Sequence, residues 1–270
     1  MIDRTGVLPN QPLFYVLASL RFQRWLSLPS KIAEIQDTLR ERFPLINQIY
    51  FGDPTQEFAP PAPSTEPAAW AFHTADRSLG CQIMPEQIVV HTTSYTRFSE
   101  FAEVFRFVLQ AVEARAKHFD VGAIGIRYLD RIAPRPGEDL SHYLPAEYLP
   151  KPLPGVGLHA ESGLSQTVYR TETGVLQARF WSGQQYLSVP DDLVPLFVMT
   201  QEFGPDGPSL PPLEPGHGIL DSDSIWSSLT PVRIGVDEAV EKLRALHSHS
   251  NDFFRTVCTE PAFAVWRGES

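Results

Sequence analysis

The sequence is poor in several features that define common protein classes. Only two cysteines occur among 270 residues, too few to hold a disulfide scaffold together. No apolar run approaches the roughly 18 residues that a membrane-spanning helix needs. The N-terminus has neither the basic start nor the apolar core of a secretory signal. Because 43% of the residues are apolar, a disordered chain is also excluded, and we expect a soluble, cytoplasmic, globular protein.

Lysine and the common cofactor motifs are scarce as well. The chain has four lysines and a formal charge of −10, and this acidic balance argues against a nucleic-acid partner. There is no phosphate-binding or dinucleotide-binding glycine loop, no G-x-S-x-G nucleophile turn, and no cysteine or histidine spacing suited to zinc. The sequence therefore predicts neither a cofactor nor a resident metal.

The first half of the chain alternates between strand-like and helix-like patterns. Apolar residues recur at helical spacing from Phe98 through Phe105 to Phe119, which predicts a core helix over 99–119. Before it we expect a strand at Leu13–Phe22, a helix from Pro29 to Phe43, a proline-rich loop at Ala59–Pro67, and strands at Ala69–Arg77, Leu79–Met84 and Gln87–Ser94.

The second half repeats this order of strand, irregular link, strands and long helix. We expect strands at 121–132, Gln166–Glu172, Val175–Trp181 and Ile219–Trp226, an apolar run at Leu193–Met199, and a final helix capped by Asp237 and ending near Val257. These patterns predict an α+β fold of two similar modules, residues 1–120 and 121–270. Each would be an antiparallel sheet packed on a long helix, with the two sheets either separate or joined into one.

Several segments resemble a sporadically distributed, uncharacterised bacterial family of roughly 250-residue proteins. The segments are the N-terminal strand LFYVLASLRF, the central strand IRYLDR, which fits the family pattern I-R-Y-x-(D/N)-R, and the C-terminal helix with LH followed by FF. The resemblance implies a bacterial, cytoplasmic protein whose patchy distribution is similar to that of mobile or defence-linked genes. It carries over no catalytic residues.

Asp221, Asp223 and His247 are the candidates for catalysis. In a strand the two carboxylates share one face, where they could hold a divalent cation or share a proton; the alternative is a solvated face of the sheet. His247 lies in the apolar stripe of the last helix, either as a buried, hydrogen-bonded residue or as a base beside Asp221 or Asp223. This set would make the protein a metal-dependent, phosphoesterase-like hydrolase.

Arg127 and the two cysteines have simpler interpretations. Arg127 either presents its guanidinium to a carboxylate or phosphate ligand, as in a small-ligand sensor, or pairs with a neighbouring strand. Arg127 and Asp130 are three residues apart, so they point to opposite faces of their strand. Cys81 and Cys258 are expected to be buried thiols.

Proline-rich loops and aromatic residues point to protein binding. The loops Ala59–Pro67, Pro145–Gly157 and Phe203–Gly218 are stiffened by proline, and Tyr148 and Phe203 would serve as interface anchors. Arg179 and Trp181 offer a second surface on an exposed sheet face. The alternative is that these loops are inert connectors. The leading hypothesis is a non-catalytic protein-binding or regulatory protein, in a defence-linked or toxin-linked system, with a partner encoded nearby.

Overall fold

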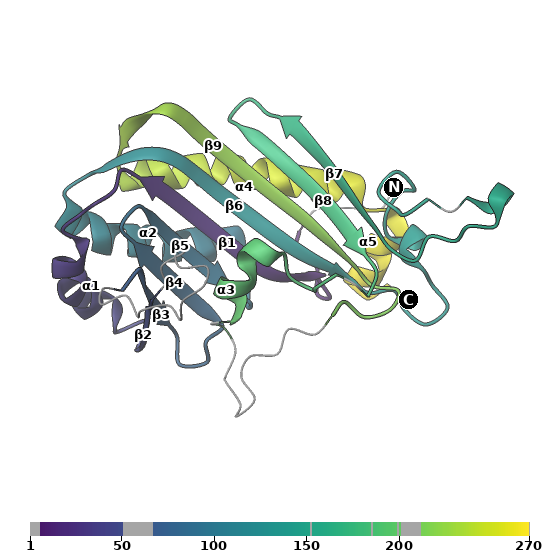
Figure 1. The fold of residues 1–270 in the computed structure, drawn as a ribbon, viewed down its shortest axis with the longest axis horizontal. Coiled ribbons are helices and arrows are strands. Elements are labelled where there is room, and N and C mark those ends of the chain that lie inside the picture. The colour runs from purple at the N-terminus through teal and green to yellow at the C-terminus, as the bar shows by residue number, and fades with distance from the viewer. Residues whose placement is uncertain are drawn as a thin grey trace, which may run out of the picture.

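In a computed structural model, a single antiparallel sheet runs through both halves of the chain (Figure 1). The structure describes residues 6–50, 67–151, 153–184, 186–198, 200 and 212–269. Within these ranges the sheet has nine strands in the order β2-β3-β4-β5-β1-β6-β9-β8-β7. The strands are β1 (Leu13–Phe22), β2 (Leu45–Ile49), β3 (Ala69–His73), β4 (Leu79–Met84), β5 (Gln87–Thr92), β6 (Phe119–Ile132), β7 (Gly163–Arg170), β8 (Val175–Ser182) and β9 (Gly218–Ile234).

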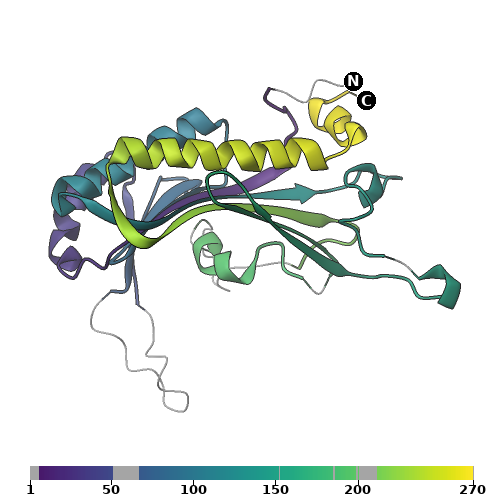
Figure 2. The ribbon, with the colours of Figure 1, turned by 90° about the horizontal axis from the view of Figure 1, so that it is seen from above.

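The helices are distributed unequally between the two faces of the sheet. Figure 2 shows α2 and α4 along one face and α3 on the other. The helices are α1 (Ile32–Leu39), α2 (Phe98–Ala116), α3 (Val194–Val198), α4 (Val236–Val257) and α5 (Glu260–Arg267), and single 3-10 turns lie at Leu28–Lys31, Leu140–His142, Pro154–Val156 and Asp191–Leu193. The predicted α+β class with antiparallel pairing is confirmed. Because β1 pairs with β6, the strands of both halves form one sheet, and the similarity of two modules stays a prediction.

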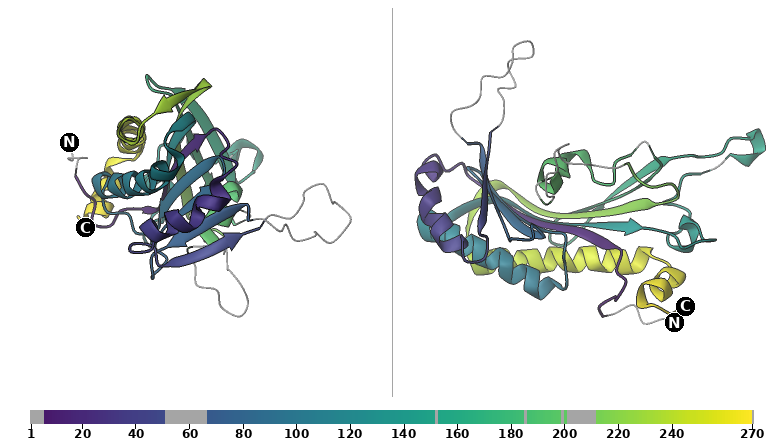
Figure 3. Two further views of the ribbon diagram at one scale, coloured as in Figure 1. Left: turned by 90° about the vertical axis from the view of Figure 1, so that its left-hand side faces the viewer. Right: turned by 90° about the horizontal axis from the view of Figure 1, so that it is seen from below.

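The main core lies between the sheet and helices α1, α2 and α4. The phenylalanine stripe of α2 is buried there as predicted, with Phe105 completely inaccessible. Phe119 belongs to this core too, but it begins β6 and does not end the helix. The helix stops earlier because Lys117 adopts a φ of 71° while its amide still donates to the carbonyl of Glu113. Figure 3 shows α3 on the opposite face of the sheet. A smaller core lies beneath it.

Five further details differ from the sequence-based expectation. β9 continues to Ile234, because its polar second half pairs with the start of β6 at Phe119–Val121. The strand β2 and the helix α5 were not predicted, and part of the apolar run near Leu193 forms α3. The N-cap of α4 is Gly235 and not Asp237. Among the described helices, none is long and apolar enough to cross a membrane.

Candidate ligand-binding pocket

A buried ion cluster occupies the sheet face that α3 covers. Arg127 donates from Nε and Nη2 to the two carboxylate oxygens of Asp221, at 2.8 and 2.9 Å, and from Nη1 to Asp192 at 2.6 Å. Arg179 donates from Nε to the same Asp221 carboxylate at 2.9 Å. Asp221 is 0% exposed, so its charge is balanced entirely by these two arginines. Arg127 is therefore engaged with neighbouring strands and the turn before α3.

The structure does not bring Asp221 and Asp223 together with His247. Alternation along β9 places both aspartates on the α3 face, whereas Ser222 and Ser224 face α4, where Ser224 and Ser250 share a hydrogen bond of 2.8 Å. His247 projects from α4, so the sheet separates it from the carboxylates. The expectation of a solvated face is wrong for Asp221, which is buried. Burial raises the pKa of Asp223 to about 6.

The described residues also do not form a metal site. Within the described ranges, no three His, Cys, Asp or Glu side chains form a group that could hold a metal ion. Both cysteines are free and buried, as predicted.

The residues predicted to form partner surfaces are largely packed inside the protein. Trp181 is buried, and its indole N–H donates to the carbonyl of Leu187 at 3.0 Å, so the face that carries it is not the exposed surface we expected. Tyr148 is half-buried against the ring of Phe253, and its hydroxyl lies 3.1 Å from that of Tyr169. Phe203 and most of Ala59–Pro67 lie outside the described residues.

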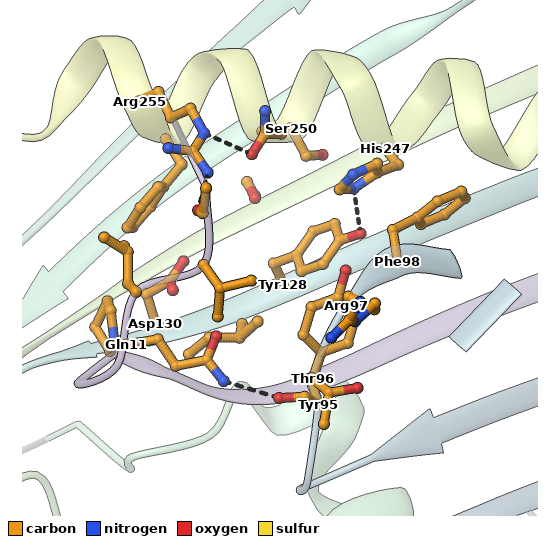
Figure 4. Close-up of a pocket in the computed structure, with 18 residues that line it drawn as sticks. Gln11, Tyr95, Thr96, Arg97, Phe98, Tyr128, Asp130, His247, Ser250 and Arg255 are labelled. Atoms are coloured by element: carbon orange, nitrogen blue, oxygen red, sulfur yellow. Dashed lines mark hydrogen bonds between the residues drawn. The ribbon is translucent and has the colours of Figure 1, made fainter. Parts of the chain in front are cut away.

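A cavity of about 210 Å³ lies between the sheet and α4 (Figure 4). Its floor is formed by side chains of β6 and β9, including Tyr128, Asp130 and Ser222, and its roof by α4. The chain before β1 closes one side, where the side-chain amide of Gln11 donates to the carbonyl of Tyr95 at 2.8 Å. The cavity is thus walled by segments from both ends of the sequence.

Asp130 is the ionisable group that the cavity leaves unpaired. Its side chain shares the helix-facing side of β6 with Tyr128 and is only 5% exposed. No described residue hydrogen-bonds to its carboxyl group or forms an ion pair with it. Burial, together with the charge of Asp221 on the other face of the sheet, raises the pKa of Asp130 to about 8. A ligand that donates hydrogen bonds or carries positive charge would stabilise the ionised form.

Aromatic side chains form the wall beside Asp130. The rings of Tyr95 and Tyr128 meet edge to face, with centroids 5.9 Å apart. The Tyr128 hydroxyl and Nδ1 of His247 form a hydrogen bond of 2.7 Å, and the imidazole stacks on Phe98 at 4.2 Å. Burial lowers the pKa of His247 to about 4, so the imidazole is neutral near pH 7. His247 is thus held as a neutral part of the wall.

The arginines that line the same cavity are occupied by partners. Arg97 lies 3.0 Å from Glu100, and Arg255 donates to Asn251 and to the carbonyl of Gly6, each at 2.9 Å. Both guanidinium groups thus bind residues other than Asp130. The cavity therefore presents an acceptor surrounded by aromatic rings.

Asp130 is not among the site residues predicted from the sequence. One signal was present: in IGIRYLDR, alternation puts Asp130 on the same face as Ile124, Ile126 and Tyr128, which are all buried. A carboxyl group on a buried strand face is unusual unless it has a partner or a ligand. Tyr95, which lies in the link before α2, had no such signal.

Comparison with known proteins adds no homologue to this description. No protein-family model matches the chain, and no curated protein matches it.

Proposed function

We propose that the protein is a non-catalytic binding protein whose cavity takes a small organic cation with N–H donors. The observation that carries this proposal is the Asp130 carboxyl group, buried in an aromatic-lined cavity without a described partner. An unpaired buried carboxylate is costly, and an ammonium or amidinium group would offset that cost with charge-assisted hydrogen bonds. The nearby rings of Tyr95 and Tyr128 add cation–π attraction.

The size of the cavity limits the ligand. Its volume of about 210 Å³ is somewhat larger than the roughly 150 Å³ cavity that accommodates benzene. A compact arylalkyl amine, alkyl amine or amidine fits this space, and a nucleotide does not. His247 supports a binding role, because its hydrogen bond to Tyr128 and its stacking on Phe98 keep it in the wall.

Matched pairs of amines and neutral isosteres test the proposal. Benzylamine and benzyl alcohol, or guanidinium and urea, would be added to the purified full-length protein while its melting temperature is recorded. We expect the cationic member of a pair to raise the melting temperature by mass action, and Asp130→Asn to abolish that rise. Asp252→Asn is the matched control, because Asp252 is an exposed carboxylate on α4. Equal shifts in the Asp130→Asn and wild-type proteins would overturn the role of Asp130.

A second candidate function is the binding of a protein partner, and one surface feature supports it. The arm between Pro150 and Gly163 projects from the body of the molecule (Figure 2) and exposes three aliphatic side chains, Leu153, Val156 and Leu158. Exposed apolar clusters often mark protein interfaces. The arm overlaps the loop Pro145–Gly157, and a partner encoded nearby, in a defence-linked or toxin-linked system, remains the hypothesis for its occupant.

The arm can be tested separately from the cavity. A Val156→Ser, Leu158→Ser variant would be co-expressed with each neighbouring gene product in turn, beside the wild type and Asp130→Asn. A partner that binds wild type and Asp130→Asn but not the arm variant supports this second function. A partner that binds all three proteins equally would place the interface elsewhere.

A further inference from the structure

Strand β7 forms an edge of the sheet that no other described element pairs with. It pairs with β8 along one side only, in an unbroken antiparallel register from Gly163 to Arg170 (Figure 1). No backbone hydrogen bond links its other side to a described residue outside the β7–β8 hairpin. Such an edge is a template for a further strand.

The edge also lacks the features that usually prevent strand addition. Its sequence GLSQTVYR contains no proline, no lysine and no acidic residue, and its pairing with β8 shows no register shift. Leu164 and Val168 are 56% and 57% exposed. Both share the α3 face of the sheet, because Leu164 pairs with Trp181. Added side chains would therefore cover apolar surface on that face.

The strand is complementary to a second copy of itself in one register. A two-fold axis perpendicular to the sheet brings residues of the same face opposite each other, so the axis must lie midway between the two copies of one residue. With the axis at Gln166, Leu164 opposes Val168 of the second copy twice, and Gln166 opposes Gln166. With the axis at Ser165 or Thr167, an aliphatic side chain opposes Gln166 instead. The central register therefore pairs like with like.

We infer that two copies of this chain pair antiparallel through β7, with Gln166 at the two-fold axis, and form one sheet that is continuous across the dimer. On the helix-facing side, Tyr148 already contacts Ser165 and Tyr169. The new side-chain contacts therefore form on the α3 face. The cavity at Asp130 takes no part in this pairing.

Sedimentation velocity of the purified full chain over a concentration series tests the pairing. We expect a concentration-dependent dimer. In Val168→Lys or Leu164→Glu, the dissociation constant of the dimer should be at least tenfold larger. Leu229→Lys is the matched control, since Leu229 is a fully exposed aliphatic residue of β9. Circular dichroism would show that each variant is folded, as expected for substitutions at exposed positions.

A charge pair tests the register itself. In the proposed register, residue 164 of one copy opposes residue 168 of the other, so a chain with both Leu164→Glu and Val168→Lys places opposite charges together twice. We expect this double variant to regain the dimer that each single variant loses, and to lose it again in high salt. A wild-type protein that stays monomeric, or a dimer that Val168→Lys leaves intact, would overturn the inference. Failure of the double variant to recover would overturn the register.

Discussion

Replacing Asp221 by Asn is expected to destabilise the protein severely, because Asp221 neutralises two arginines inside it. The substitution keeps the shape of the side chain and removes only its charge. Arg127 is then left buried, with Asp192 as its remaining hydrogen-bond partner and Asp223 as a carboxyl neighbour, and Arg179 loses its hydrogen-bonded carboxylate. Removing one partner of a buried ion pair costs about 3–5 kcal/mol, because the other charge stays desolvated.

The control for this prediction is the other carboxylate on the same arginine. Asp192 also pairs with Arg127 but is 60% exposed. Water therefore screens this pair, and Asp192→Asn should cost only about 0–1 kcal/mol. Urea unfolding of the two variants, followed by circular dichroism, measures both free energies. A cost below about 1 kcal/mol for Asp221→Asn would refute the reasoning, because Asp221 would then have to be hydrated.

The charge-free cluster offers a complementary test. Changing Arg127 and Arg179 to Met together with Asp221 to Leu removes the fully buried carboxylate and both of its arginines. Asp223 stays on the same face and takes up a proton, since burial raises its pKa. Such replacements are often neutral or stabilising, so the triple variant should be more stable than Asp221→Asn alone. The reverse order of stability would show that the cluster contributes a net attraction that hydrophobic packing cannot replace.

Three further predictions concern packing and metals. Phe105→Ala should lower the free energy of unfolding by about 3–5 kcal/mol, since Phe105 is fully buried, and a loss below about 1 kcal/mol would contradict its place in the core. Gly80→Ala should cost about 1–3 kcal/mol in denaturant unfolding, because the new methyl group would lie 2.4 Å from the ring of His73. Gly122→Ala, where no atom lies within 4 Å, is its control and should stay near wild type. Mg²⁺ or Mn²⁺ should leave the melting temperature unchanged, because Asp221 is already paired with arginine; a shift that Asp221→Asn removes would contradict this.

The parts of the fold that depend on local patterns could be predicted from the sequence. The apolar residues of α2 repeat at helical spacing, and strands β4 and β8 are bounded by turn residues. Strand β2 could not be found this way, because it is mostly exposed and is held by pairing with β3. The second half of β9 is polar and is held by β6, so its length depends on a neighbour distant in the sequence.

The sites depend even more on contacts between distant residues. Arg127 and Asp221 are 94 residues apart, and their pairing requires β6 and β9 to be neighbours, which no local pattern reveals. The same arrangement separates His247 from Asp221 and Asp223, although aspartate and histidine side chains both suit hydrolysis. Asp130 becomes a cavity residue only when α4 and the chain before β1 close over it.

The ionisation of Asp130 links the cavity to pH. Its pKa in the folded protein, about 8, lies above the ordinary value of 3.8. The folded state therefore holds this proton more tightly, and the contribution of Asp130 to the free energy of unfolding decreases as the pH rises from about 4 to about 8. A cationic ligand requires the ionised carboxylate, so its affinity should rise with pH and level off above pH 8.

A carbon NMR titration of the Asp130 carboxyl group tests the central claim most directly. The signal would be assigned by its loss in Asp130→Asn and followed with and without benzylamine. We predict a pKa near 8 in the free protein and a clear decrease when the amine is bound, because the ammonium group stabilises the carboxylate. A carboxyl group that titrates near its ordinary value and does not respond to the amine would contradict the account.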